Sequence, residues 1–274
     1  LPAYPAENDE VRCESRTVCR GGNAANTLVV LGQSGHACNW AGVLTDDAEG
    51  RFVRDDLAAA GVETTGCHVV SRGAMPVSMV ILGTATGSRT IIHYRDLPEY
   101  SAEAFGDIPL QDFDWLHFEG RNIAELGRML EQVRARRPAI SVSLEVEKPR
   151  EGIEALFGQA DVLLFSADYA RHRGYDAPAA LLQDMSRQAP AADMYCTRGA
   201  SGAVSMDRSG ALYRQPALTS GPVVDTLGAG DAFNAGVIAG YLDGLDMAGI
   251  LRLACDVAGR KCMQGGFSGL KVTD

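Results

Sequence analysis

Residues 225–231 read Asp-Thr-Leu-Gly-Ala-Gly-Asp and run directly into an apolar segment of small residues, 232–240. Gly228 and Gly230 permit tight or positive-φ backbone and leave room for a ligand to approach the main chain. The free N–H groups at the start of the following helix, together with the positive end of its dipole, form a site for anionic oxygens. Asp231, at the junction, is expected to be ionised and able to take a proton from a hydroxyl that attacks phosphorus. A glycine turn, an anion site and a base so close together predict phosphoryl transfer.

The same junction has other interpretations. An aspartate at a helix N-terminus is most often only a cap, and Gly-x-Gly before a helix is common in α/β proteins. The dinucleotide fingerprint requires a third glycine where this sequence has Phe233, and the P-loop requires a Gly-Lys-Ser/Thr that the sequence lacks. An NAD-linked dehydrogenase and a P-loop enzyme are therefore disfavoured.

Composition limits the class of protein. The chain has 274 residues, 46% of them hydrophobic, with a net charge of −10 and a pI near 5.0. This is enough for a single α/β domain over 1–274, and the acidic charge argues against nucleic acid or an anionic membrane as the main partner. The sequence has no apolar run near the roughly 20 residues of a membrane span and no signal peptide, so we expect a cytoplasmic protein. Seven scattered cysteines without a C-x-x-C pair favour reduced, mostly buried thiols over a zinc site.

Helix-like and strand-like segments alternate along the chain. Helices are expected over 22–31, 46–60, 123–133, 168–172, 178–186, 231–242 and 247–263, and strands over 38–43, 115–118, 140–146, 161–165 and 194–197. The helix over 46–60 is expected to open with the capping pair Asp46-x-x-Glu49. This order predicts β-α-β units, with a mostly parallel sheet, helices on both faces and ligands at the carboxyl ends of the strands.

Region 67–95 breaks the alternation. The strand-like runs Val77–Leu82 and Arg89–Tyr94, joined by a glycine-containing turn over 84–88, predict a hairpin. Together with residues 4–20, of which 11–19 are expected to join it, this region would form a small sheet standing off the main domain. A lid and an ordinary edge extension are both compatible with the pattern. Since exposed sheet edges are commonly covered, we expect a homodimer that pairs two lids, with a solvated monomer as the alternative.

Two motifs resemble the signatures of the PfkB, or ribokinase-like, carbohydrate kinases. Residues 225–231 are similar to the family pattern D-T-x-G-A-G-D, and residues 20–26, Arg-Gly-Gly-Asn-Ala-Ala-Asn, are similar to its G-G-x-x-x-N signature. Segments 87–91, 117–122, 144–151 and 257–262 resemble the ketohexokinase branch, and the resemblance runs from about residue 9 to about residue 269. It implies a Rossmann-like domain with a β-sheet lid that uses ATP and magnesium to phosphorylate a sugar hydroxyl. A ketohexose phosphorylated at C1 is the first choice; ribose, another hexose and a nucleoside are the alternatives.

The resemblance also implies roles for individual residues. Asp231 would be the catalytic base, and the anion hole would consist of Gly228, Ala229 and Gly230. The sugar would be bound by Gly22, Asn23, Asn26 and Arg121, with Asp231. The nucleotide would be bound by Arg89 from the lid, the loop Gly199, Ala200, Ser201 and Gly202, Asp225, and Cys255 and Ala258 on the adenine-pocket helix. From the residues alone, Arg89 could instead be a solvated strand arginine. The loop over 199–202 could be a plain hairpin turn, and Cys255 and Ala258 could be core residues. Likewise, Glu119, Arg121 and Asn122 either touch the sugar, order the cluster of Glu145, Glu147 and Lys148, or form a purely structural network.

Two features depart from the family pattern. Family members usually begin with an apolar strand that carries a sugar-binding aspartate, and the start of this sequence shows neither. We expect that strand to be missing from the chain as given, because an empty central position would leave backbone groups unpaired. Where many relatives have N-x-x-E for magnesium, this chain has residues 166–169, Ser-Ala-Asp-Tyr, so the candidates for metal binding are Glu145, Glu147 and Asp168. These departures also suggest a sugar- or nucleotide-binding protein without turnover, although the intact 228–231 motif argues against it.

Overall fold

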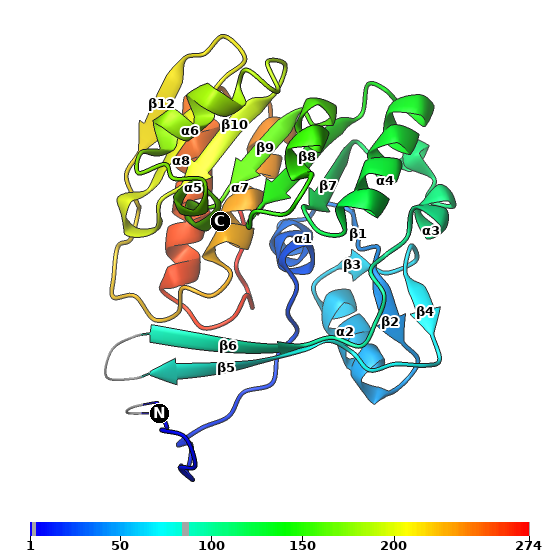
Figure 1. Cartoon of the computed structure of the whole chain (residues 1–274), viewed down its shortest axis with the longest axis vertical. Helices are drawn as coiled ribbons and strands as arrows, with labels where there is room; N and C mark the ends of the chain where they lie inside the picture. The colour runs from blue at the N-terminus through cyan, green and yellow to red at the C-terminus, as the bar shows by residue number, and fades with distance from the viewer. Residues whose placement is uncertain (2–3, 84–87, 274) are drawn as a thin grey trace.

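A six-stranded sheet occupies the centre of the structure (Figure 1), a computed structural model that describes residues 1, 4–83 and 88–273. Its order is β12-β11-β10-β9-β8-β7. The strands are β7 (Trp115–Glu119), β8 (Ser141–Val146), β9 (Val162–Phe165), β10 (Asp193–Thr197), β11 (Ala203–Met206) and β12 (Leu212–Gln215). β7 to β10 are parallel, while β11 and β12 are antiparallel additions at one edge. The predicted mostly parallel sheet is confirmed.

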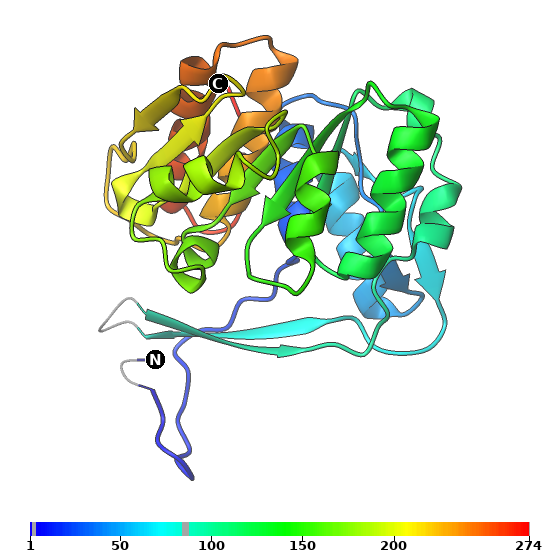
Figure 2. The same cartoon turned by 45° about the horizontal axis from the view of Figure 1, so that its top comes forward.

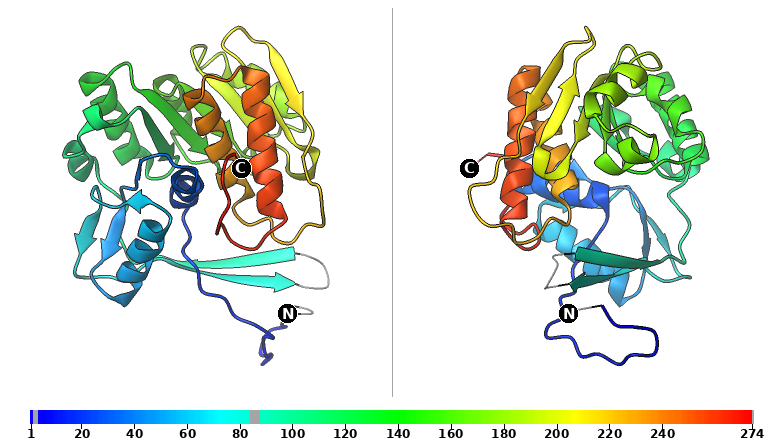
Figure 3. Two further views of the ribbon diagram at one scale, coloured as in Figure 1. Left: turned by 180° about the vertical axis from the view of Figure 1, so that it is seen from behind. Right: turned by 60° about the vertical axis from the view of Figure 1, so that its left-hand side comes forward.

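Helices cover both faces of this sheet, as Figure 3 shows. One layer contains α3 (Ala102–Gly106), η1 (Leu110–Asp112), α4 (Ile123–Arg136), η2 (Ile153–Gln159), α5 (Ala167–His172) and α6 (Pro178–Met185). The other contains α1 (Asn23–Gln33), α7 (Ala229–Leu242) and α8 (Met247–Cys262). Successive residues of β9 face opposite layers: Leu163 packs with the first and Leu164 with the second. All four residues of β9 are buried, as expected for a central parallel strand.

Small residues allow α7 to lie deep in the second layer. It is buried without interruption from Asp231 to Gly240, so it has no solvent-exposed face over these residues. A Cβ on Gly236 would lie 2.6 Å from the Cα of Ala254 on α8, which means that the two helices approach closely only because this residue is glycine. The apolar run after the 225–231 stretch is thus a buried helix that fixes the position of its own N-terminus.

A smaller unit carries β1 (Cys38–Asn39), β2 (Val43–Thr45), α2 (Ala48–Ala59), β3 (Val62–Glu63) and β4 (His68–Val70), with β1 parallel to β3 and β2 parallel to β4. Two predictions are corrected here. The single strand expected over 38–43 is two short strands with different partners. The cap of α2 is Asp47, whose side chain accepts hydrogen bonds from the main-chain N–H groups of Glu49 and Gly50, so the expected cap at Asp46 was one residue early.

An antiparallel hairpin of β5 (Val77–Gly83) and β6 (Ser88–Tyr94) stands apart from both units (Figure 2), as the sequence predicted. The turn expected over 84–88 falls mostly on residues 84–87, which lie outside the described residues. The expectation that residues 11–19 join this sheet was wrong. Residues 4–20 form no strand, and every residue from 11 to 19 is exposed, because the segment has no buried face against which an alternating pattern could pack. At the first residue, the amino group of Leu1 donates to the main-chain oxygen of Leu82 in β5 at 2.9 Å.

Candidate active site

The 225–231 stretch forms the turn that opens α7. Gly228 has φ 80°, and a Cβ there would lie 2.2 Å from Cζ of Phe267, so both the backbone and the neighbouring ring require glycine. The N–H of Ala229 donates to the main-chain oxygen of Thr226 at 3.3 Å within the turn. Asp231 follows in the first turn of α7 and is 6% exposed. The turn and the first turn of the helix thus have the form that the sequence predicted.

The N-terminal motif meets this turn, because α1 packs against α7. The amide Nδ2 of Asn26 donates to Oδ2 of Asp231 at 2.6 Å. One residue later, the hydroxyl of Thr27 donates to the main-chain oxygen of Asp231 at 3.1 Å. The two segments that carry the family resemblance, about 200 residues apart in sequence, therefore converge on one carboxyl group.

The environment of Asp231 changes one prediction. Burial raises the pKa of Asp231 to about 8; the hydrogen bond from Asn26 opposes this, the charges of Glu119 and Glu147 add to it, and Arg20 opposes it. The sequence led us to expect an ionised carboxylate, and that expectation was wrong for this arrangement. The helix N-terminus favours the anion, but burial and the neighbouring carboxylates outweigh it, and neither is visible in the local sequence.

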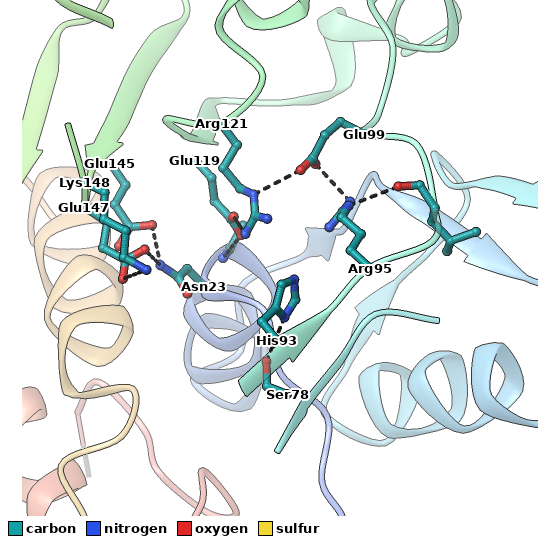
Figure 4. Close-up of polar contacts among 12 residues, drawn as sticks. Asn23, Ser78, His93, Arg95, Glu99, Glu119, Arg121, Glu145, Glu147 and Lys148 are labelled. Atoms are coloured by element: carbon teal, nitrogen blue, oxygen red, sulfur yellow. Dashed lines mark hydrogen bonds and ion pairs between the residues drawn. The ribbon is translucent and has the colours of Figure 1, made fainter. Parts of the chain in front are cut away.

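Those carboxylates come from the carboxyl ends of β7 and β8, shown in Figure 4. Glu119 accepts a hydrogen bond from the N–H of Ala24 at 2.7 Å and so satisfies one of the unpaired donors at the start of α1. Gly120 brings the ends of the two strands together: its N–H donates to the main-chain oxygen of Glu145 at 2.8 Å, and a Cβ there would lie 2.6 Å from that oxygen. Burial raises the pKa of Glu119, and it raises that of Glu145 further.

Asn23 hydrogen-bonds to two carboxylates at the carboxyl end of β8, Glu145 on the strand and Glu147 just after it. Its Nδ2 donates to Glu145 at 3.2 Å and to Glu147 at 3.4 Å, and Figure 4 shows it at the start of α1, beside both glutamates. Glu145 also accepts from Nδ2 of Asn234 at 3.2 Å. Asn234 was not predicted as a site residue, although it follows Asp231 by three residues on the same helix and therefore shares its face, a spacing that would have identified it.

Arg121 lies on the other side of Glu119. Its guanidinium is 3.7 Å from Glu119 and 3.3 Å from Glu99, which in turn pairs with Arg95 at 3.0 Å (Figure 4). The sequence did not indicate Glu99 or Arg95, which belong to the segment after the hairpin. Asn122 is left-handed, with φ 36°, and precedes α4.

Two adjoining hollows meet at Glu145. The first lies beside the start of α1 and is lined by Asn23, Glu119, Gly120, Arg121, Glu147, Lys148 and Arg150. The second, toward the start of α7, is lined by Leu164, Phe165, Ser166, Thr197, Gly230, Phe233 and Asn234. Both lie at the carboxyl ends of parallel strands, where ligands bind in open α/β sheets.

The hairpin reaches the 225–231 stretch. Nη1 of Arg89 on β6 donates to the hydroxyl of Thr226 at 3.0 Å. Asp225 accepts from the N–H of Leu227 at 2.8 Å and from Nζ of Lys261 at 3.0 Å. Although burial acts to raise the pKa of Asp225, these two bonds hold it below its usual value. Lys261 is fully buried and was not singled out from the sequence.

The remaining nucleotide candidates lie around β10, β11 and α8. The 3₁₀ helix η3 (Gly199–Ser201) joins β10 to β11 and is exposed. Gly202 has φ 86°, and a Cβ there would lie 2.0 Å from the main-chain oxygen of Gln215. On α8, Ala258 is half-buried, whereas Cys255 lies in the core against α7, where burial raises the pKa of its thiol to about 12.

The structure separates the three metal candidates. Glu145 and Glu147 share Asn23 as a partner, whereas Asp168 is exposed and pairs with Arg171 within α5. Across residues 1, 4–83 and 88–273, no three histidine, cysteine, aspartate or glutamate side chains form a group that could hold a metal ion alone. Nor is any helix in these ranges long and apolar enough to cross a membrane.

Comparisons with known proteins agree with this arrangement. The pfkB family carbohydrate kinase profile matches residues 2–270. The chain is 38% identical over 275 aligned residues to ketohexokinase from Mus musculus, covering 97% of this chain and 92% of that protein. Among solved structures, a fructokinase with bound ATP from Xylella fastidiosa matches with a TM-score of 0.76 and 24% identity, over 92% of this chain and 88% of that one. An E. coli protein described as a ribokinase II, in complex with ATP and Mg²⁺, matches with a TM-score of 0.79 and 18% identity, over 97% and 92%. The chain therefore belongs to the pfkB family of carbohydrate kinases.

Proposed function

We propose that this kinase transfers the γ-phosphoryl group of ATP to the C1 hydroxyl of a ketohexose, with fructose the first choice. The observation that carries the proposal is the contact between Asn26 and the buried Asp231 at the glycine turn of α7. It combines a polar group suited to sugar hydroxyls, a candidate base and an anion site in one place. The choice of a ketohexose rests on the 38% identity to the mouse ketohexokinase.

In this mechanism Asp231 accepts the proton of the attacking hydroxyl. A base is most effective when its pKa lies near the working pH, and the pKa of Asp231 is raised to about 8. Gly228, Ala229 and Gly230, at the start of α7, stabilise the charge of the transferring group. Arg89 adds a positive charge from the hairpin, and its hydrogen bond to Thr226 holds that charge close to the turn.

The sugar would lie in the hollow that contains Asn23 and Arg121, next to Asn26 and Gly22. Side-chain amides both donate and accept hydrogen bonds, as pairs of neighbouring hydroxyls require. Arg121 is held by Glu119 and Glu99, so its guanidinium has a fixed direction before the substrate binds. Closure of the hairpin over this hollow would exclude water, which would otherwise compete as the acceptor.

Magnesium fits the carboxylate cluster of Glu145 and Glu147. Burial beside other carboxylates raises the pKa of Glu145, and a bound cation would favour its ionised form. Mg²⁺ commonly takes one or two protein carboxylates and completes its shell with phosphate oxygens and water. Such a site needs no complete set of protein ligands, and it leaves out Asp168. The ion would neutralise charge on the phosphates of ATP.

The nucleotide would extend from the second hollow toward Gly199, Ala200, Ser201 and Gly202, with Ala258 of α8 on the adenine side. A Cβ on Gly199 would meet no atom within 4 Å, so the loop is open there. Cys255 would support this helix from the core, and Asp225 would hold the turn through its bonds to Leu227 and Lys261.

We also propose a homodimer formed through the hairpins. Cross-strand pairing places Val77 opposite Tyr94 and Met79 opposite Ile92, and these four side chains on one face are between 43% and 58% exposed. Arg89 belongs to the opposite face, which faces the site. The seven free cysteines are compatible with a reducing compartment, which we take to be the cytoplasm. At a net charge of −10, nucleic acid and anionic membranes are not expected partners.

The test is ATP consumption by the purified protein with Mg²⁺ and fructose, ribose, other hexoses or adenosine, followed by ³¹P NMR of the product. We expect turnover on fructose to give the 1-phosphate, with the Asp231→Asn protein as the control for contaminating kinases. Turnover on another acceptor would reject the ketohexose and keep the base. Sugar binding without ATP consumption would instead identify a binding protein of the same fold.

A further inference from the structure

Arg20 is a buried cation that the proposed reaction leaves without a role. It lies two glycines before α1 and is 9% exposed, whereas residues 4–19 are all exposed. Its Nη1 donates to Oδ1 of Asn26 at 2.7 Å, and its Nε donates to Oδ2 of Asp56 on α2 at 2.7 Å. Since Asn26 donates in turn to Asp231, the side chains of Asp56, Arg20, Asn26 and Asp231 form one continuous chain of hydrogen bonds.

The chemistry of the amide gives this chain a direction. A primary amide has one end that accepts and one end that donates, whereas a guanidinium can only donate. With Arg20 on one side, Oδ1 of Asn26 must face the guanidinium and Nδ2 must face Asp231. Without Arg20, a half-turn of the amide would present Oδ1 to Asp231 instead, and an acceptor at that position favours the protonated carboxyl group, which is inactive as a base.

We propose that Arg20 is a positioning residue of the phosphoryl-transfer site: it fixes the Asn26 amide in the orientation that donates to Asp231, and Asp56 fixes Arg20. The inference rests on the proposed function, because it assigns Arg20 a purpose only if Asp231 is the base. Asn26 then has two roles, since its amide lowers the pKa of Asp231 and so favours the ionised base, and it also binds hydroxyl groups of the acceptor.

The charges around Asp231 determine the direction of the expected effect. Glu119 on β7, Glu145 on β8 and Glu147 just after β8 carry charges that favour its protonated form, while Arg20 and the N-terminus of α7 favour the ionised form. Removing Arg20 takes away a positive charge and frees the amide. Both changes move the titration of Asp231 to higher pH. Asp56 is half-exposed, so its own charge is largely compensated by Arg20 and solvent.

The first experiment compares wild-type protein with Arg20→Met over pH 6 to 10, using the acceptor that the wild type turns over. We expect the rising limb of kcat/KM to move up by about one pH unit and kcat at pH 7 to fall about tenfold, with the KM for ATP nearly unchanged. Arg16→Met, at an exposed arginine in the same segment, is the matched control and should behave as wild type. A profile of Arg20→Met that coincides with that of the wild type would overturn the proposal.

A double-mutant comparison separates orientation of the amide from simple charge. In Asn26→Ala there is no amide to orient, so adding Arg20→Met should cause only the smaller shift that comes from loss of the positive charge. A shift as large as the one that Arg20→Met causes in the wild-type background would mean that Arg20 acts on Asp231 through its charge alone, and it would reject the role assigned to the amide. If Arg20→Met does not fold, Arg20→Gln serves instead: its side chain can donate or accept, so it does not fix the amide, and an unshifted profile would again reject the proposal.

A measurement without turnover keeps this inference separate from the proposed function. Titration of ¹³C-labelled aspartate carboxyl groups by NMR, assigned with Asp231→Asn, reports the protonation of Asp231 in wild-type and Arg20→Met protein. A higher midpoint in the variant supports positioning by Arg20, and an equal midpoint overturns it. Failure of the wild type to phosphorylate any acceptor would reject the proposed function and leave this comparison interpretable.

Discussion

Asp231 is a residue whose burial favours the reaction at the expense of stability. The pKa of its carboxyl group is about 8 in the folded protein and about 4 in an unfolded chain. Between these values the folded state holds a proton that the unfolded state releases, so the contribution of Asp231 to stability falls as the pH rises from about 4 to about 8. Asp231→Asn removes this titration and keeps a group that can accept from Asn26.

We therefore predict opposite effects of Asp231→Asn on activity and stability. Turnover should fall by about a thousandfold, as expected for loss of a general base. The melting temperature should be close to that of wild type at pH 5 and higher than that of wild type at pH 9. Calorimetry at both pH values, with steady-state rates, tests this. A variant that retains full activity, or that melts lower at pH 9, would contradict the assignment.

At this scale the sequence predicted residue identity better than residue environment. Asp231, Asn23 and Asn26 were found because the motifs that contain them are local. The protonation of Asp231 was mispredicted because it depends on Glu119 and Glu147, which approach only when β7 and β8 lie beside α1. Lys261 was missed for the same reason, because its partner Asp225 is distant in sequence.

Among the elements, the position of α8 requires a glycine where the helix packs against a neighbouring loop. A Cβ on Gly259 would lie 1.6 Å from the main-chain oxygen of Leu218, so α8 and the segment after β12 could not keep their present spacing. Because backbone cannot move as cheaply as a flexible side chain, we predict that Gly259→Ala lowers the free energy of unfolding by roughly 1–3 kcal/mol. Since Ala258 precedes it, the KM for ATP should rise as well.

Urea denaturation and ATP kinetics measure both effects. Gly265→Ala is the matched control: a Cβ there would meet no atom within 4 Å, and the position is beyond the end of α8. It should change stability by only a few tenths of a kcal/mol. Equal unfolding free energies for Gly259→Ala and wild type would show that the contact with Leu218 relaxes without cost.

Elements with a strong pattern were predicted well, and those with weak patterns were not. The helix over 123–133 corresponds to α4, whose apolar residues are spaced for burial on one face. The strand over 161–165 corresponds to β9, whose continuous apolar run matches burial on both faces. Residues 11–19 contain β-branched residues but no partner and no buried face. The cap at Asp47 rather than Asp46 shows that adjacent aspartates cannot be distinguished without backbone geometry.

For the molecule as a whole, the arrangement of the sheet leaves one prediction open. Across the ranges that the structure describes, the central sheet ends at β7, all five residues of which are half-buried. The expected N-terminal strand with a sugar-binding aspartate stays a prediction. The sequence could predict the order of layers, since alternation of strands and helices dictates it, but not which distant segments form each edge.

The hairpin provides the last prediction, because its apolar face has no cover within the chain that the structure describes. Met79 and Ile92 are 58% and 51% exposed and lie opposite each other across the two strands. If two hairpins pair through this face, Met79→Lys and Ile92→Lys should convert the dimer to a monomer in sedimentation equilibrium, because burying an unpaired ammonium group is costly. Leu242→Lys, an exposed leucine at the end of α7, should leave the assembly unchanged. Since Arg89 belongs to the same hairpin, the monomeric variants should also have a higher KM for ATP. A wild-type protein that sediments as a monomer at micromolar concentration would reject the dimer and leave the hairpin acting only as a lid.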